Sequence, residues 1–165
     1  MTRVALLRAI NAGITLPMAD LRRIAAELGL ANPRTFIASG NLLFDSPLPD
    51  AEVRQLLESR LTAHTGKPTW LTLRTGAELA ALVAANPFPD QPGNRVFVTF
   101  LDSDPPPDAI SQARNRTDEQ LALAPRAIVT HYPGNMGQSR LLIPAAKVGT
   151  ARNMNTVAKL AEWSR

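Results

Sequence analysis

The sequence contains no cysteine among its 165 residues, and this absence excludes several kinds of chemistry. The chain can form no disulfide, cannot bind zinc through thiolates and has no cysteine nucleophile. A chain without disulfides is compatible with a reducing compartment, and we expect the protein to be cytoplasmic.

Long apolar stretches are absent as well. The N-terminal residues begin as an apolar run, but Arg8 and Asn11 interrupt it within a few positions. A membrane-spanning helix needs about 20 predominantly apolar residues, and a secretory leader needs a longer apolar core than this one. The sequence therefore predicts no targeting segment and no membrane partner.

Aromatic residues are scarce, at 5% of the chain. RNA-recognition sheets stack bases on aromatic side chains of their central strands, and the strands expected to be central here carry Phe44 alone. Nucleic-acid binding is therefore weakly supported, in a mode that contacts phosphates only. The net charge of +4 indicates either a solvated basic surface or a patch that binds phosphate groups.

The residues of ordinary catalytic sites are few. His64 and His131 are the two histidines, and Ser39 and Ser139 have no identifiable base nearby in the sequence. No metalloprotease helix, nucleophile elbow or phosphate-binding Gly-Lys loop is present. The sequence predicts no metal site and no cofactor, and it leaves open whether the protein is an enzyme.

The elements that are present follow a recognisable order in residues 1–74. Hydrophobic periodicity and turn residues predict a strand, a helix, a hairpin, a second helix and a further strand. These elements are a strand at Arg3–Ile10, a helix from Pro17 to Gly29, hairpin arms at Arg34–Ala38 and Asn41–Asp45, a helix from Pro49 to Gly66, and a strand that includes Trp70 and ends at Arg74. The βαββαβ order predicts a ferredoxin-like subdomain, in which two helices cover one face of an antiparallel sheet.

Residues 75–165 repeat this rhythm less clearly. Thr75 and Glu78 have the spacing of a capping box at the start of a helix. The later elements are a strand at Arg95–Leu101, weak helical turns over 108–124, strands at Arg126–Tyr132 and Ser139–Pro144, and a helix from about Asn153. We therefore expect an α+β fold of two ferredoxin-like subdomains with antiparallel sheets, with the C-terminal helix in the second.

Three polar clusters interrupt this otherwise ordinary pattern. The first, Arg8 and Asn11, follows from an arginine inside an apolar strand, which either pairs with a carboxylate or binds an anion. The second, Ser39 and Asn41, is either a hairpin turn or a set of donors for an anion, and Gly137–Arg140 resembles it.

The third cluster is the stretch TARNMNT, which contains Arg152, Asn153 and Asn155. The N-terminus of a helix favours anions, and an arginine fork matches carboxylate or phosphate. The same residues could instead cap the helix and join the two halves of the protein.

Several of these stretches resemble one known family. The segments VALLRAINAG, RTFIASGNLLFDS, ELAALVAANPF, GQSRLL and TARNMNTVAKLAE occur in the order found in the bacterial domain-of-unknown-function family 1697. The resemblance implies two ferredoxin-like subdomains and implies no activity. It also implies a glycine where this chain has Ala9 and a tryptophan where it has Met154.

These observations lead to a hypothesis about function. We expect an anionic small ligand, such as a nucleotide or a phosphorylated metabolite, to bind in a cleft between the subdomains. The expected ligand-binding residues are Arg8, Asn11, Ser39, Asn41, Arg152, Asn153 and Asn155. The alternative is a non-enzymatic module that binds nucleic acid or protein and uses the polar clusters to hold its subdomains together. The sequence leaves the oligomeric state open.

Overall fold

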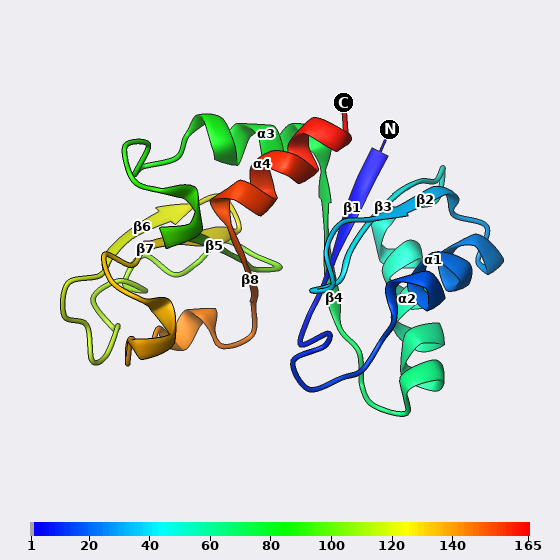
Figure 1. Cartoon of the computed structure of the whole chain (residues 1–165), viewed down its shortest axis with the longest axis horizontal. Helices are drawn as coiled ribbons and strands as arrows, with labels where there is room; N and C mark the ends of the chain where they lie inside the picture. The colour runs from blue at the N-terminus through cyan, green and yellow to red at the C-terminus, as the bar shows by residue number, and fades with distance from the viewer. Residues whose placement is uncertain (1) are drawn as a thin grey trace. The chain divides into compact units, whose positions relative to one another are not determined.

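The computed structural model describes residues 2–165, which form two compact units (Figure 1). Unit 1 extends to Leu79 and also includes Leu160–Arg165, and unit 2 is Ala80–Lys159. The division falls within two helices, α3 (Gly76–Ala84) and α4 (Met154–Trp163). The predicted α+β class and the two antiparallel sheets are confirmed.

Unit 1 has the predicted βαββαβ order. Its elements are β1 (Thr2–Leu7), α1 (Met18–Glu27), β2 (Ala31–Thr35), β3 (Asn41–Asp45), α2 (Asp50–Thr65) and β4 (Leu71–Thr75). The strands lie in the order β2-β3-β1-β4, and every neighbouring pair is antiparallel. This is the ferredoxin-like arrangement, with α1 and α2 on the same face of the sheet (Figure 1).

The core of unit 1 lies between that sheet face and the two helices. Leu7 and Phe44 from the strands pack with Ile24 from α1 and Leu57 from α2, and each of the four is at most 1% exposed. Burying each such side chain contributes about 1.5–3 kcal/mol relative to leaving it in water. The apolar stripes predicted for both helices are therefore the residues that attach them to the sheet.

Strand β1 ends at Leu7, three residues earlier than the sequence predicted. Ala9 and Asn11 have φ angles of 60° and 56°, which no extended strand accommodates. Arg8 therefore lies just after the strand. The arginine within the strand is Arg3, whose Nη1 lies 2.5 Å from a carboxylate oxygen of Asp50.

The first hairpin arm also differs from the prediction, because β2 begins at Ala31 instead of Arg34. Asn32 has a φ of 53°, and the register with β3 shifts between Ala31 and Arg34. Pro33 is tolerated because β2 is an edge strand, where a missing N–H leaves no ladder bond unmade. Asn32 and Pro33 therefore lie in a bulge within β2.

Unit 2 contains a second sheet with the equivalent strand order. Its strands are β5 (Val96–Phe100), β6 (Gln120–Ala124), β7 (Ala127–His131) and β8 (Thr150–Asn153), in the antiparallel order β6-β7-β5-β8. Short 3-10 turns accompany them: η1 (Gly93–Arg95), η2 (Met136–Gln138) and η3 (Pro144–Ala146). Every strand of unit 2 thus has a counterpart at the same place in unit 1.

Two predictions for unit 2 were wrong. Residues 120–124 form strand β6 and not a helical turn, and Ser139–Pro144 forms no strand beyond the single bridge between Arg114 and Leu142. The hairpin therefore joins β6 to β7 through Pro125 and Arg126. In the stretch QLALA the leucines are two residues apart, which indicates a strand, but the alanines suit a helix equally well. The pattern of this stretch therefore does not distinguish the two.

The C-terminal residues of unit 1 pack against its edge strand. The ring of Trp163 meets that of Phe36 edge to face, with 5.2 Å between centroids, and the carbonyl of Trp163 accepts a bond from Arg34 at 2.8 Å. A Cβ added to Gly76 would lie 2.6 Å from that of Ser164, so glycine is required for this approach. Residues 160–165 are thus an integral part of unit 1.

Candidate functional site

Four of the seven predicted site residues gather at one end of the sheet in unit 1. Arg8 and Asn11 lie in the loop that follows β1, and Ser39 and Asn41 lie where the chain enters β3. The backbone N–H of Leu7 donates to the carbonyl of Gly40 at 2.9 Å, which brings the two loops together. These four residues therefore lie in one neighbourhood of unit 1.

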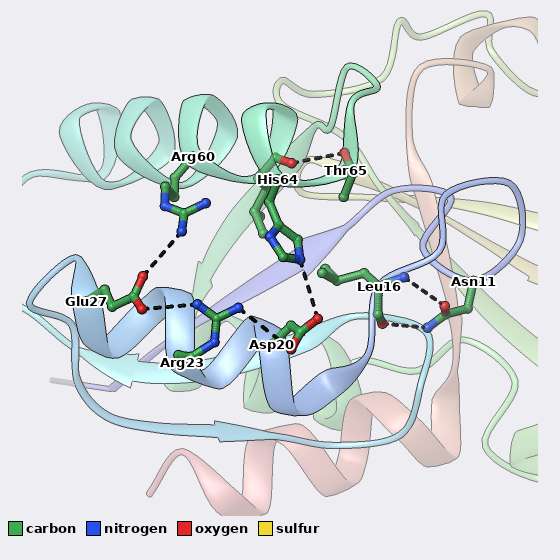
Figure 2. Close-up of polar contacts among 9 residues, drawn as sticks. Asn11, Leu16, Asp20, Arg23, Glu27, Arg60, His64 and Thr65 are labelled. Carbon is green, nitrogen blue, oxygen red and sulfur yellow. Dashed lines mark hydrogen bonds and ion pairs between the residues drawn. The ribbon is translucent and has the colours of Figure 1, made fainter.

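Asn11 connects the two loops. Its Nδ2 donates to the carbonyl of Leu16 at 3.1 Å, and its Oδ1 accepts from the N–H of Leu16 at 3.1 Å (Figure 2). The same Nδ2 donates to the carbonyl of Ala38 at 2.7 Å. Both amide hydrogens are thus used within the protein. The role that this geometry gives Asn11 is to hold the loop in shape.

Asn41 and Ser39 make a similar local arrangement. The Asn41 side chain is fully buried, and its Nδ2 donates to the carbonyl of Phe36 at 2.9 Å and to Ser39 Oγ at 3.1 Å. These bonds close the connection between β2 and β3, in which Gly40 has a φ of 91°. An added Cβ at Gly40 would come within 3.0 Å of the Leu7 side chain.

Arg8 lies beside the ring of Trp70, a residue that no pattern in the sequence singles out. The guanidinium carbon is 5.7 Å from the centroid of the Trp70 ring, and the backbone N–H of Arg8 donates to the Trp70 carbonyl at 2.9 Å. Trp70 is 54% exposed, and Lys67 donates from Nζ to the carbonyl of Gly13 at 3.1 Å. We call Arg8, Lys67, Trp70 and loop residues 9–13 the Arg8–Trp70 surface.

Backbone strain is concentrated in the same loops. Ala9, Asn11 and Ile37 all have positive φ, at 60°, 56° and 54°. For a β-branched residue such as Ile37 this conformation is an outlier, and for alanine it costs about 1–2 kcal/mol. The glycine that the family resemblance implies at position 9 would adopt the same conformation without strain.

The other predicted site residues lie in unit 2, where β8 meets α4. TARN is the edge strand β8, which the sequence did not predict, whereas the predicted helix does follow it, from Met154. Nη1 of Arg152 donates to Thr150 Oγ1 at 2.8 Å and to the Ala151 carbonyl at 2.9 Å. Burial of this guanidinium lowers the pKa of Arg152 to about 10, because the charged form loses hydration.

Asn153 and Asn155 have separate places at the start of α4. Oδ1 of Asn153 accepts from the N–H of Thr156 at 2.9 Å, so Asn153 caps the helix, which is one of the two roles that the sequence left open for it. The Asn155 side chain lies over η1, since a Cβ added to Gly93 would be 2.0 Å from its Oδ1. Met154, between them, is only 5% exposed and occupies a packed position.

Unit 1 contains the same arrangement at the end of β4. Nη1 of Arg74 donates to Thr72 Oγ1 at 2.9 Å and to the Leu73 carbonyl at 2.8 Å. The next residue, Thr75, caps α3 in a reciprocal pair with Glu78, and both bonds are 3.1 Å long, so the predicted capping box is confirmed. Thr-x-Arg followed by a helix cap is thus a repeated feature of the fold, which gives Arg152 a structural role independent of any ligand.

The second glycine-containing loop, Gly137–Arg140, lies near carboxylates. A hollow of about 150 Å³ is lined by Thr117, Asp118, Glu119, Tyr132, Gly134, Asn135, Gln138 and Ser139. Bonds from Thr117, and from the Ser139 hydroxyl among others, hold the pKa of Glu119 below its usual range. The negative charge of Glu119 makes this loop an unfavourable place for an anion.

The two histidines have structural surroundings. Nε2 of His64, near the end of α2, lies 3.4 Å from Asp20 on α1, within a group of ion pairs that joins the two helices (Figure 2). His131 is buried on β7 near the Phe88 ring, and its Nδ1 has no hydrogen-bond partner within residues 2–165. Over the same residues, no three His, Asp or Glu side chains are grouped as a metal site.

The part of the chain that the structure describes has no helix with the length and apolarity needed to cross a bilayer. Fold and site together define an α+β protein with two ferredoxin-like sheets and a strained, partly cationic loop surface on the first. The chain belongs to the family described as "Protein of unknown function (DUF1697)", whose model matches residues 1–128.

A solved structure with a similar fold is that of the conserved bacterial protein SP0830 from Streptococcus pneumoniae. The TM-score is 0.81 at 23% sequence identity, over 99% of this chain and 97% of that one. At this identity the likeness establishes the fold alone. No curated protein sequence matches the chain.

Proposed function

We propose that this cytoplasmic protein binds an anionic small ligand with a planar ring, such as a nucleotide, at the Arg8–Trp70 surface. The observation that carries the proposal is the guanidinium of Arg8 beside the exposed ring of Trp70. An exposed indole offers a face on which a base can stack, and an arginine fork matches a phosphate. The pair therefore provides for both parts of a nucleotide within a few ångströms.

The charges around this surface favour an anion. Lys67 adds a second cation, held near Gly13 by its bond to that carbonyl. The carboxylate of Glu58 is already occupied, because it accepts from Arg54 Nε at 2.9 Å and from the Leu71 N–H at 3.2 Å. Positive charge thus predominates on the exposed side chains of the surface.

Strain in the neighbouring backbone supports the same assignment. Residues held at unfavourable φ cost stability and often occur at binding sites, where they fix the shape of a loop. Ala9, Asn11 and Ile37 are three of the six non-glycine residues with positive φ in the described chain. Asn11 holds these loops in place before any ligand arrives, which reduces the entropy lost on binding.

The test uses Trp70 as its own reporter. The chain has two tryptophans, so Trp163→Phe leaves Trp70 as the single indole while retaining a ring beside Phe36. This variant is titrated with adenosine monophosphate, ribose 5-phosphate and inorganic phosphate, and indole fluorescence and melting temperature are followed. We expect the nucleotide to quench Trp70 and to bind more tightly than the two compounds that lack a base.

A pair of arginine variants distinguishes binding at the Arg8–Trp70 surface from general attraction of the nucleotide to positive charge. Arg8→Gln should weaken nucleotide binding by about tenfold or more, in line with the loss of about 1.4 kcal/mol. Arg22→Gln removes an exposed cation whose guanidinium bonds Thr35 outside the Arg8–Trp70 surface, and it should bind like the parent. If none of the three compounds changes the fluorescence or melting temperature at millimolar concentration, the proposal is wrong.

The alternative is single-stranded nucleic acid, which an arginine and an exposed tryptophan would bind with the same chemistry. An oligonucleotide that binds far more tightly than the mononucleotide, with a steep dependence on salt, would favour that alternative. The hypothesis of a cleft between the halves, with Arg152, Asn153 and Asn155 as further ligands, stays a prediction. Under it, Arg152→Ala would weaken nucleotide binding as much as Arg8→Gln.

A further inference from the structure

Strand β6 differs from the other three edge strands of the two sheets. β2 carries Pro33, a bulge and Arg34, and these features discourage pairing with another strand. In β4 and β8, Arg74 and Arg152 each bond a carbonyl of their own strand. β6, with the sequence QLALA, has no charge, no proline and no register shift.

The free edge of β6 presents unpaired backbone groups. Pro125 and Arg126 connect β6 to β7, so the closing pair, Ala124 and Ala127, exchanges both of its ladder bonds. Bonding alternates along an antiparallel ladder, and Ala122 therefore also faces inward, toward Val129. The N–H and C=O groups of Leu121 and Leu123 must then point outward, to an edge that no strand of residues 2–165 covers.

An apolar hollow adjoins this edge. It measures about 330 Å³ and is lined by Asp104, Pro105, Leu123, Ala124 and Pro125. Leu123 is 40% exposed, although its neighbours across the ladder are buried. A strand added at this edge would place one of its side chains beside Leu123 and next to the hollow.

We propose that two copies of this chain pair through β6, antiparallel, about a two-fold axis at Ala122. This register is self-complementary, because it sets Leu121 of one copy opposite Leu123 of the other, twice. Each pair joins residues whose backbone groups point outward, so four hydrogen bonds form and the two sheets become one. The same register places Leu121 of the second copy beside Leu123, where the hollow can receive it.

The charges at the two ends of β6 select the antiparallel pairing of two copies. Asp118 precedes the strand and is exposed, and Arg126 follows it in the turn. In the register centred on Ala122, Asp118 lies opposite Arg126 of the second copy, whereas a parallel alignment would bring like charges together. The interface is isologous, as closed dimers require.

A cysteine at the axis provides the sharpest test, since the native chain has none. Across a non-hydrogen-bonded antiparallel pair the Cα atoms are about 4.5 Å apart, within the range that a disulfide spans. Ala122→Cys should therefore form a covalent dimer under mild oxidation. Val148→Cys, at an exposed position of unit 2 outside β6, is the matched control and should cross-link at least tenfold more slowly.

A second variant tests the unmodified edge. Leu123→Lys places a charge on β6 and should raise the dimer dissociation constant, measured by analytical ultracentrifugation, by about tenfold or more. Val148→Lys should leave it unchanged. The proposal is overturned if the full chain is monomeric up to about 100 µM and Ala122→Cys cross-links no faster than Val148→Cys. It is equally overturned by a dimer that Leu123→Lys does not weaken, which would place the interface elsewhere.

Discussion

Each unit has its own sheet with the same strand order, but the two units differ in the segments that connect the strands. In unit 1 the connections contain α1 and α2, which cover one face of the sheet. In unit 2 the corresponding segments, residues 101–119 and 132–149, contain turns, η2, η3 and the single bridge between Arg114 and Leu142, but no α-helix. Strand order, the Thr-x-Arg bonds and the helix cap are nevertheless the same in both. The features common to both units are therefore the strand order and the edge arginines, whereas the connecting segments can be either helices or loops.

The largest loss of stability should come from substitutions in the two cores, which pack against helices in unit 1 and against loops in unit 2. Leu57→Ala removes a fully buried side chain of α2, and Ile143→Ala removes a smaller amount of apolar surface from the cluster in unit 2. We expect losses of about 3–4 kcal/mol and about 2 kcal/mol in the free energy of unfolding, because the residual cavity is larger among packed helices. Urea denaturation measures both, and equal losses would contradict the distinction between the covers.

The edge arginines should behave alike in the two units. Arg74→Ala and Arg152→Ala each remove a buried guanidinium and two of its hydrogen bonds, and we expect each to cost about 2–3 kcal/mol. Arg60→Ala, at a helix surface, should change stability by less than about 1 kcal/mol. If Arg74→Ala were much less destabilising than Arg152→Ala, the two Thr-x-Arg arrangements would not contribute equally to stability.

The two caps provide a smaller comparison. Thr75→Ala removes the acceptor for the Glu78 N–H, and Asn153→Ala removes the acceptor for the Thr156 N–H. Each should lower the free energy of unfolding by about 1 kcal/mol. Thr75→Ser and Asn153→Asp keep a hydrogen-bond acceptor and should retain most of this stability. If they lose as much stability as the alanine variants, the side chains do not stabilise the helices by capping.

The smallest expected effect is a gain in stability on replacing Ala9, a residue of unit 1 with a strained backbone conformation. Ala9→Gly should raise the free energy of unfolding by about 0.5–1 kcal/mol, since relief of a positive φ exceeds the added freedom of the unfolded chain. Ala12→Gly, where φ is not positive, should instead lower it. A melting temperature that falls for both variants would contradict the assigned strain.

Sequence patterns identified the helices because their start and stop signals are local. Gly66 ends α2 in the left-handed conformation, Thr75 and Glu78 form their predicted capping box, and Asn153 caps α4. The strands were harder, because a strand depends on partners far away in the chain. β8 was missed for this reason: the four residues TARN have no strand pattern of their own and form a strand by pairing with β5.

The candidate site was predictable in part. Asn11, Ser39 and Asn41 stood out by composition, and the structure places them together with hydrogen bonds to the loops around them. Trp70 did not stand out, because the pattern placed it in a strand and gave no sign that its ring would remain 54% exposed. Its proximity to Arg8 depends on the pairing of β1 with β4, which links residues more than 60 positions apart.

The contacts of Trp163 and Ser164 with unit 1 have a consequence for the order in which the chain can fold during synthesis. The βαββαβ portion emerges from the ribosome first, but Leu160–Arg165 belong to the same unit and follow only after all of unit 2. At about 5–20 residues per second this interval is on the order of 10 s. Phe36, next to the edge strand β2, thus lacks its contact with the Trp163 ring until synthesis has passed Trp163.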